Sequence, residues 1–367
     1  MAEVTGRMRA SGPYLAELER CAGYVSGIDR LRGKSVFVTG CNGLICSALI
    51  DVLLFLNDRH GCGITVYAAT RNMEKTGSIF AGRGGGLLNI VPYDACRPLA
   101  FGGKADFYVH GAGNASPDLF MSQPVETMTA NFLGLGEILA DAVRTGGRVL
   151  YISSSEVYGL LAADSPIRED EQGYVDPGSP RSCYAASKRA AETLCAAYRK
   201  EYGVDYVIAR PGHIYGPTAG TGDIRASSDF LRRAAVGEDI VLRSRGSQLR
   251  SYCFVFDCVI QLLTVMLLGE SGEAYNISNP RSRITIAEMA HAVARLAGVE
   301  CLYEPMPDEH DNPMRNSSLS SGKFASLLGM DERAMEAWGG CLDAEEGFAR
   351  SLRILKAYES AGGNGGT

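Results

Sequence analysis

Short apolar runs alternate with longer segments of helical periodicity up to residue 211. Six runs have the length and composition of buried strands, and they span residues 35–40, 64–69, 87–93, 105–113, 148–154 and 204–211. Helical patterns lie between most of them, over residues 45–59, 125–146 and 185–202. Buried strands that alternate with helices form a parallel sheet covered on both faces. The sequence therefore predicts an α/β fold with a doubly wound parallel sheet.

The alternation weakens after Pro211, where we expect a smaller C-terminal α/β lobe over residues 212–358. One strand or helix of this region could return to the main sheet of residues 34–211. Residues 13–29 predict an amphipathic helix packed outside the core, within an N-terminal extension of residues 1–33. Residues 359–367 are expected to form a flexible tail. Within the lobe, helical patterns cover 224–238, 256–269 and 285–298, and short extended segments cover 239–244, 273–279 and 301–307.

Composition and charge exclude several classes of function. The formal net charge of −6 argues against general binding of nucleic acid or of an anionic membrane. No apolar run reaches the roughly 18 residues that a membrane span needs, and the N-terminal residues lack the apolar core of a signal peptide. The 11 cysteines include no CxxC pair and are not grouped with the five histidines. We therefore expect reduced thiols, a cytoplasmic protein and no metal site.

A glycine-containing loop joins the first strand to the first long helix. Gly40, Gly43 and Cys46 have the spacing G-x-x-G-x-x-C, with Asn42, Leu44 and Ile45 between them. Glycine lets a phosphate approach the backbone closely, and amides at a helix N-terminus attract a pyrophosphate. The third position of such loops serves helix–strand packing, for which cysteine is small enough. The loop therefore predicts a dinucleotide site, with a simple tight turn as the alternative.

The second strand lacks the acid that usually binds the adenosine ribose of a dinucleotide. Arg71 follows this strand, and it could accept the 2′-phosphate of NADP or be a solvated loop arginine. Asp94 follows the third strand, where it could hydrogen-bond the adenine amino group or cap a helix. The choice between NAD and NADP stays open at this point.

Tyr184 lies four residues before Lys188, so both side chains lie on one side of a helix. The charge of the lysine is expected to stabilise the phenolate and to lower the pKa of Tyr184. The pair could then transfer a proton in the conversion of an alcohol to a ketone. The YxxxK spacing also occurs by chance, but here it follows "RVLYISSSEVYG", a strand that ends in hydroxyl groups. One of these serines could hold the same substrate oxygen.

Four motifs in order, "TGCNGLIC", "SSSEVYG", "YAASK" and "ARPGHIYGP", resemble those of the extended short-chain dehydrogenase/reductases. Within these, the chain is similar to the NAD-dependent nucleotide-sugar epimerases, dehydratases and decarboxylases, from about residue 34 to about residue 330. The resemblance implies a Rossmann domain that binds NAD and a C-terminal lobe that holds a nucleotide sugar. It also implies a homodimer built from the helices near residues 125–145 and 184–202.

The resemblance also implies roles for individual residues. Tyr184 is the expected base, Lys188 its partner at the nicotinamide ribose, and Ser154 the hydroxyl that binds the reacting sugar, while Asn131 matches the central helix. The expected cofactor-binding residues are Gly40, Asn42, Gly43, Leu44, Ile45, Arg71, Asp94, Ala112, Tyr184, Lys188 and Pro211. The expected substrate-binding residues are Ser116, His213, Arg250 and Arg315.

The residues after Ser154 bear on the net reaction. The related 4,6-dehydratases carry an aspartic acid where this chain has Ser155, and a serine hydroxyl cannot protonate a departing hydroxyl group. Ser155 and Glu156 instead resemble the UDP-glucuronate decarboxylases, in which Glu156 and Arg250 would place or protonate the decarboxylated carbon. Decarboxylation of a UDP-hexuronate is therefore predicted, with 4-epimerisation and 4,6-dehydration as alternatives. His213 departs from the asparagine of that family and bears on substrate identity.

Two other classes of function remain open. One is a net NAD(P)-dependent alcohol or hydroxysteroid dehydrogenase, which Arg71 favours. The other is a non-catalytic nucleotide-binding regulator, against which the intact set of Ser154, Tyr184 and Lys188 argues.

Overall fold

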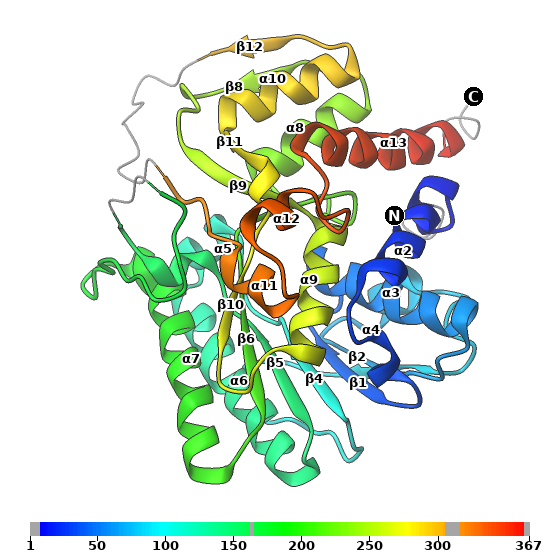
Figure 1. The fold of residues 1–367 in the computed structure, drawn as a ribbon, viewed down its shortest axis with the longest axis vertical. Helices are drawn as coiled ribbons and strands as arrows, with labels where there is room; N and C mark the ends of the chain where they lie inside the picture. Colours follow the sequence, from blue (N-terminus) through cyan, green and yellow to red (C-terminus); the bar gives the residue numbers. More distant parts are fainter. Residues whose placement is uncertain (1–7, 162–164, 305–315, 363–367) are drawn as a thin grey trace.

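A seven-stranded parallel sheet forms the larger part of the molecule (Figure 1). The computed structural model describes residues 8–161, 165–304 and 316–362. The strand order is β10-β6-β5-β4-β1-β2-β3. Strands β2 and β3 lie on one side of β1, and the chain then crosses to add β4, β5 and β6 on the other side, as in doubly wound folds. The strands are β1 (Ser35–Thr39), β2 (Thr65–Thr70), β3 (Leu88–Pro92), β4 (Phe107–His110), β5 (Arg148–Ile152), β6 (Tyr206–Pro211) and β10 (Ala274–Ile277).

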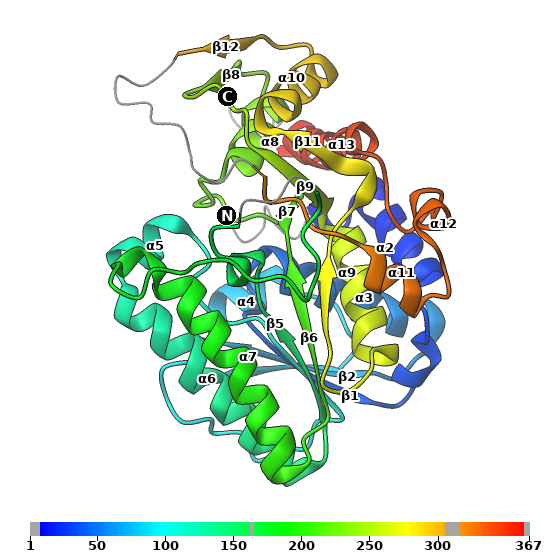
Figure 2. The ribbon, with the colours of Figure 1, turned by 60° about the vertical axis from the view of Figure 1, so that its left-hand side comes forward.

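Successive side chains of each strand point to opposite faces of the sheet, and each face has its own hydrophobic core. In β1, Val36 and Val38 pack on one face and Phe37 on the other. Helices α3 (Leu44–His60) and α9 (Val255–Leu268) cover the first face, whereas α6 (Pro124–Thr145) and α7 (Cys183–Tyr202) cover the second (Figure 2). The six predicted strands and three predicted helices are all present, within a few residues of the expected bounds.

The sheet also takes in two elements that the sequence patterns placed in the C-terminal region. Strand β10 pairs in parallel with β6, and α9 packs against α3 and β6. This is the return to the main sheet that the sequence left open. Helix α9 joins the sheet domain because it is buried over nearly its whole surface and therefore needs apolar neighbours on more than one side.

The smaller lobe lies at one end of the main sheet (Figure 1). It contains a three-stranded sheet in the order β11-β9-β7 and a two-stranded sheet of β12 and β8. Its strands are β7 (His213–Tyr215), β8 (Ile240–Leu242), β9 (Leu249–Phe254), β11 (Arg283–Thr285) and β12 (Cys301–Tyr303), and its main helices are α8 (Ala226–Ala235), α10 (Ile286–Ala297) and α13 (Ala344–Gly362).

The N-terminal helix α2 (Gly12–Tyr24) is part of the core, which corrects the expectation that it packs outside it. Asp51, in the middle of α3, is fully buried and accepts hydrogen bonds from Arg9 and from the hydroxyl of Tyr14. Arg83 forms an ion pair with the same carboxylate. The charged side chain of Asp51 thus ties α2 to the sheet domain. No helix among the described residues is long and apolar enough to cross a membrane.

Candidate active site

The carboxyl ends of β1, β4, β5 and β6 meet at one edge of the main sheet, next to the N-terminus of α3. Gly40 has φ +71°, and a Cβ atom there would lie 2.6 Å from the carbonyl oxygen of Gly111. Gly43 is the N-cap of α3 and supplies no side chain to cap it, so the first-turn amides of Leu44 and Ile45 have no intrahelical acceptor. These amides fit the expected pyrophosphate site.

Cys46 performs the packing role expected at the third position of the glycine loop. Its sulfur lies where a Cβ atom on Gly111 would sit, and Gly111 follows β4. Burial raises the pKa of the Cys46 thiol, so it stays protonated and unreactive at neutral pH. Gly111, just after β4, therefore leaves the space that the side chain of Cys46 fills.

The expected cofactor residues around β2 and β3 differ in how they are held. The side chain of Asn42 donates to Thr70 Oγ1 at 3.1 Å, which fixes the loop to the end of β2. Arg71 is exposed and donates to Glu126 Oε1 at 3.0 Å. Asp94 Oδ1 accepts from the backbone amide of Cys96 at 3.0 Å, which closes a local turn, and its Oδ2 lies 3.6 Å from Arg97 Nε.

Three further expected residues lie along the same edge. Ala112 follows β4, and its amide donates to Thr39 Oγ1 at 3.1 Å. Pro211 is buried at the end of β6. Ser116 is the half-buried N-cap of helix α5 (Pro117–Ser122), and its hydroxyl does not cap that helix. Asn131 of α6 is buried and donates to Ser187 on α7, so it fixes these two helices to each other.

Tyr184 and Lys188 lie on the inner face of α7, and both are buried. Lys188 Nζ donates to the carbonyl oxygen of Ile152 at 2.8 Å and lies 4.8 Å from the ring centre of Tyr151 and 5.8 Å from that of Tyr184. Burial lowers the pKa of Lys188 to about 8, while the Coulomb attraction of Glu192 opposes the change.

The pKa of Tyr184 is raised to about 12, which corrects the expectation that its lysine neighbour lowers it. Burial is the largest cause, and the negative charge of Glu156 adds to it. A hydrogen bond with Ser154 and the charge of Arg225 act in the opposite direction.

The segment after β5 places the polar groups of Ser154 and Glu156 near Tyr184. Ser154 caps the 3₁₀ helix η2 (Ser155–Tyr158), where its hydroxyl accepts from the amide of Glu156 at 3.2 Å. Ser155 is half-buried in the first position of η2. Glu156 forms a two-pronged ion pair with Arg181 at 3.2 and 3.3 Å.

Arg181 and Phe120 were missed by the sequence reasoning. The guanidinium group of Arg181 lies 4.5 Å from the ring centre of Phe120, and Phe120 stacks on Tyr184 with 5.2 Å between ring centres and 15° between planes. Arg181 lies three residues before Tyr184, which was available from the sequence, whereas the stacking of a ring from α5 was not.

The C-terminal lobe contributes a group of cations. His213 on β7 and Arg250 on β9 lie on adjacent parallel strands. Burial, together with the charges of Arg250 and Arg225, holds the pKa of His213 well below its ordinary value, so the imidazole is neutral at pH 7. His213 Nδ1 and Arg250 Nε are buried and have no hydrogen-bond partner in the described part of the chain. Buried polar atoms of this kind usually bind a ligand or ordered water.

Arg225, which sequence reasoning also missed, precedes α8 and forms a two-pronged ion pair with Asp223. Its charge acts on Tyr184, which the sheet domain supplies, and on His213, which the smaller lobe supplies. Arg225 is therefore a shared neighbour of the residues from the two lobes. Arg315, an expected substrate-binding residue, lies outside the described residues.

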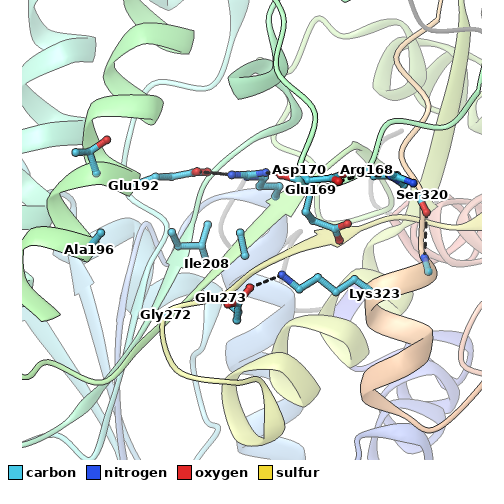
Figure 3. Close-up of a pocket in the computed structure, with 14 residues that line it drawn as sticks. Arg168, Glu169, Asp170, Glu192, Ala196, Ile208, Gly272, Glu273, Ser320 and Lys323 are labelled. Atoms are coloured by element: carbon cyan, nitrogen blue, oxygen red, sulfur yellow. Dashed lines mark hydrogen bonds and ion pairs between the residues drawn. The ribbon is translucent and has the colours of Figure 1, made fainter. Parts of the chain in front are cut away.

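A separate hollow of about 780 Å³ lies between α7, the strands β6 and β10, and helix α11 (Gly322–Leu327), as Figure 3 shows. Most of its charged side chains are already paired with each other, among them Glu192 with Arg210 at 2.7 Å and Lys323 with Glu273 at 2.6 Å. None of the expected site residues lines it. The candidate active site is therefore the edge of the sheet around Tyr184. No cluster of potential metal ligands occurs among residues 8–161, 165–304 and 316–362.

Comparison with known proteins identifies the family of the chain. Residues 36–278 match the model of the NAD dependent epimerase/dehydratase family. The chain is 31% identical over 335 residues to UDP-glucuronic acid decarboxylase 1 of Danio rerio, which covers 90% of this chain and 74% of that protein. It is 32% identical over 322 residues to UDP-glucuronic acid decarboxylase 6 of Arabidopsis thaliana, which covers 88% of this chain and 90% of that protein.

Solved structures share the fold. An epimerase from Methanothermobacter thermautotrophicus aligns with a TM-score of 0.75 at 21% identity, over 92% of this chain and 96% of its own. A dTDP-glucose 4,6-dehydratase from Streptomyces venezuelae aligns with a TM-score of 0.71 at 24% identity, over 89% of this chain and 98% of its own. The α/β fold and the family resemblance predicted from the sequence are confirmed, and the chain belongs to the NAD dependent epimerase/dehydratase family.

Proposed function

We propose that this chain binds NAD and decarboxylates a UDP-linked hexuronate by way of a 4-keto sugar. The observation that carries the proposal is the arrangement around Tyr184. Its hydroxyl interacts with Ser154, and the cations Arg225 and Arg250 come from the opposite lobe. A phenol and a hydroxyl group suit a sugar alcohol, and arginines suit a diphosphate or a carboxylate.

The glycine loop fits NAD on geometric grounds. Gly40 adopts a backbone conformation that other residues rarely take, and Gly43 leaves the N-terminus of α3 open to a phosphate. The amides of Leu44 and Ile45 would hold the pyrophosphate, and Lys188 would face the nicotinamide ribose. When bound, NAD⁺ would accept the hydride from sugar C4 and would return it, as NADH, to the ketone carbon after CO₂ has left.

The residues of the chain then account for the remaining chemistry. Tyr184 would accept the proton of the C4 hydroxyl as a phenolate, a form that the positive charge of bound NAD⁺ would favour against the burial that raises its pKa, and Ser154 would keep that oxygen within reach. The product is a β-keto acid, so the bond to its carboxylate breaks with release of CO₂ and the electron pair moves toward the ketone oxygen. Arg250 binds the carboxylate or the developing oxyanion. Glu156, whose charge acts on Tyr184, would return a proton to carbon once it separates from Arg181 and is protonated.

Two observations favour decarboxylation over dehydration. Ser155 offers no acid for a leaving hydroxyl group. The relatives that align over about nine tenths of this chain bear the name UDP-glucuronic acid decarboxylase. A second candidate is 4-epimerisation, which needs no additional acid. The ion pair between Glu156 and Arg181 favours it, because that pair withdraws the carboxylate from the reacting sugar.

The test is incubation with NAD⁺ and UDP-glucuronate, UDP-glucose or dTDP-glucose in separate reactions, with product masses read by mass spectrometry. We expect UDP-glucuronate to lose the mass of one CO₂. A product of unchanged mass but altered chromatographic position would indicate epimerisation. Loss of water from a hexose would contradict the role assigned to Ser155.

We also propose that the chain forms a homodimer through α6 and α7. Val125, Met128 and Leu133 are exposed apolar residues on α6, and Tyr202 adds to them at the end of α7. A stripe of this kind on two adjacent helices suits a two-fold contact with a second copy of the same stripe. Light scattering should give the mass of a dimer, and Leu133→Glu should give a monomer. Val236→Glu, at an exposed apolar position of the other lobe, should leave the dimer intact.

The free cysteines of the structure support a cytoplasmic location, which we propose on that ground.

A further inference from the structure

The end of β2 lacks the acid that dinucleotide-binding chains usually place there, and the structure brings an acid to it from another element. Arg71 follows β2, and its Nη1 donates to Glu126 Oε1 at 3.0 Å. Glu126 lies in the first turn of α6, 55 residues away along the chain. The sequence pattern around β2 alone therefore gives a misleading view of the charge at this end of the strand.

Two carboxylates and two arginines balance each other around the ends of β2 and β3. Arg71 is paired with Glu126, and Arg97 lies 3.6 Å from Asp94. The thiol of Cys96 lies within reach of three of these groups, since its pKa is raised by burial, Asp94 and Glu126 and lowered by Arg71. The charges of these four side chains cancel, although Arg71 taken alone suggests a surplus positive charge.

We propose that Glu126 makes this chain select NAD over NADP. Glu126 neutralises Arg71 and places its own charge at the end of β2, where the adenosine ribose of a dinucleotide lies in this type of fold. A 2′-phosphate at that place would have to break the ion pair and approach the carboxylate. A 2′-hydroxyl group carries no charge and can hydrogen-bond either member of the pair. The proposal depends on the proposed binding of a nicotinamide dinucleotide.

The exposure of the pair makes Arg71 able to turn toward a ligand. The Arg71 side chain is 63% exposed and that of Glu126 is 37% exposed. Ion pairs at such positions contribute little to stability, so the fold does not depend on this one. Replacement of Glu126 by glutamine therefore should leave the chain folded and release Arg71 to bind a phosphate.

The test measures dissociation constants for NAD⁺ and NADP⁺ by calorimetric titration, with 5′-AMP and adenosine 2′,5′-bisphosphate as probes that need no catalysis. The intact chain should bind NAD⁺ more tightly than NADP⁺. Glu126→Gln should shift the ratio about tenfold toward NADP⁺, which is typical of one charge-assisted hydrogen bond. The same shift should occur between the two adenosine probes, and adding Arg71→Ala to Glu126→Gln should abolish it.

Glu304→Gln is the matched control, because Glu304 forms an exposed ion pair with Arg243 at 2.6 Å in the other lobe. It makes the same change in net charge and should leave the ratio unchanged. A ratio unaffected by Glu126→Gln, or tighter binding of NADP⁺ by the intact chain, would overturn the role of Glu126 and leave the proposed function standing. If the intact chain bound neither dinucleotide, both the role of Glu126 and the proposed function would fail.

Discussion

Lys188 carries an ammonium group in the interior of the protein, and the cost of burying it can be measured. Burial lowers the pKa of Lys188 from 10.5 to about 8, with partial compensation from Glu192. At about 1.4 kcal/mol per pH unit, this change corresponds to roughly 3 kcal/mol of lost stability at neutral pH. Lys188→Met removes that cost but leaves the carbonyl of Ile152 without its donor, which costs about 1–2 kcal/mol. We expect Lys188→Met to be more stable than the parent chain by about 1–2 kcal/mol near pH 7, and inactive.

The same reasoning fixes the direction of the pH dependence. The pKa of Lys188 is lower in the folded chain than in the unfolded one. Between about pH 8 and pH 10.5 the unfolded chain therefore binds one more proton than the folded chain. The burial cost is therefore complete below pH 8 and declines as the pH rises through this window. The stability advantage of Lys188→Met should shrink by about 2 kcal/mol between about pH 7 and pH 9.5.

Urea unfolding followed by circular dichroism measures both quantities. The matched control is Lys200→Met, which makes the same substitution at an exposed position of α7 and should change stability by less than about 0.5 kcal/mol at either pH. The reasoning would be refuted if Lys188→Met were less stable than the parent chain near pH 7. It would also be refuted if the difference between the two chains did not depend on pH.

Three further predictions concern the site and its support. Tyr184→Phe should lower turnover by about 10²–10⁴-fold while the dissociation constant for NAD⁺ stays the same, and retention of turnover would contradict the assignment of the base. Gly40→Ala should weaken NAD⁺ binding at least about tenfold and lower the melting temperature, because its Cβ would meet the carbonyl of Gly111 at 2.6 Å; unchanged binding would argue against this loop as the cofactor site. Asp51→Asn should lose about 3–5 kcal/mol in urea unfolding, because it leaves Arg9 buried without its counter-charge, and a loss below about 1 kcal/mol would show that the pair is unimportant.

Local patterns in the sequence were sufficient for six of the seven strands of the main sheet and for the residues near their carboxyl ends. Buried strands need apolar side chains on both faces, so each strand appears in the sequence as a short continuous run of apolar residues. The order of the glycine loop, the serines and the Tyr184–Lys188 pair placed them at the carboxyl ends of parallel strands, where the structure has them. One feature of the sequence pointed to the burial of α2. Asp51 lies inside the otherwise apolar run of α3, and its partners Arg9 and Tyr14 come from the N-terminal segment.

The features that the sequence did not reveal depend on contacts between distant segments. Arg225 acts on Tyr184 only because the smaller lobe brings it there, and Glu126 reaches Arg71 only because α6 begins beside the end of β2. The pKa of Tyr184 was expected to fall because helical spacing places Lys188 near it. Spacing does not tell how deeply the phenol is buried or that the negative charge of Glu156 acts on it, and these two facts raise the pKa instead.

The most direct test of the account follows the hydrogen at sugar C4. UDP-glucuronate carrying deuterium at C4 is incubated with the chain and NAD⁺, and the product is analysed by mass spectrometry and nuclear magnetic resonance. Transient oxidation predicts a slower reaction than with the unlabelled substrate, loss of CO₂, and deuterium retained at C4 of the product. Deuterium that accumulates in released NADH would indicate a net dehydrogenase, and decarboxylation at an unchanged rate in Tyr184→Phe would contradict the mechanism itself.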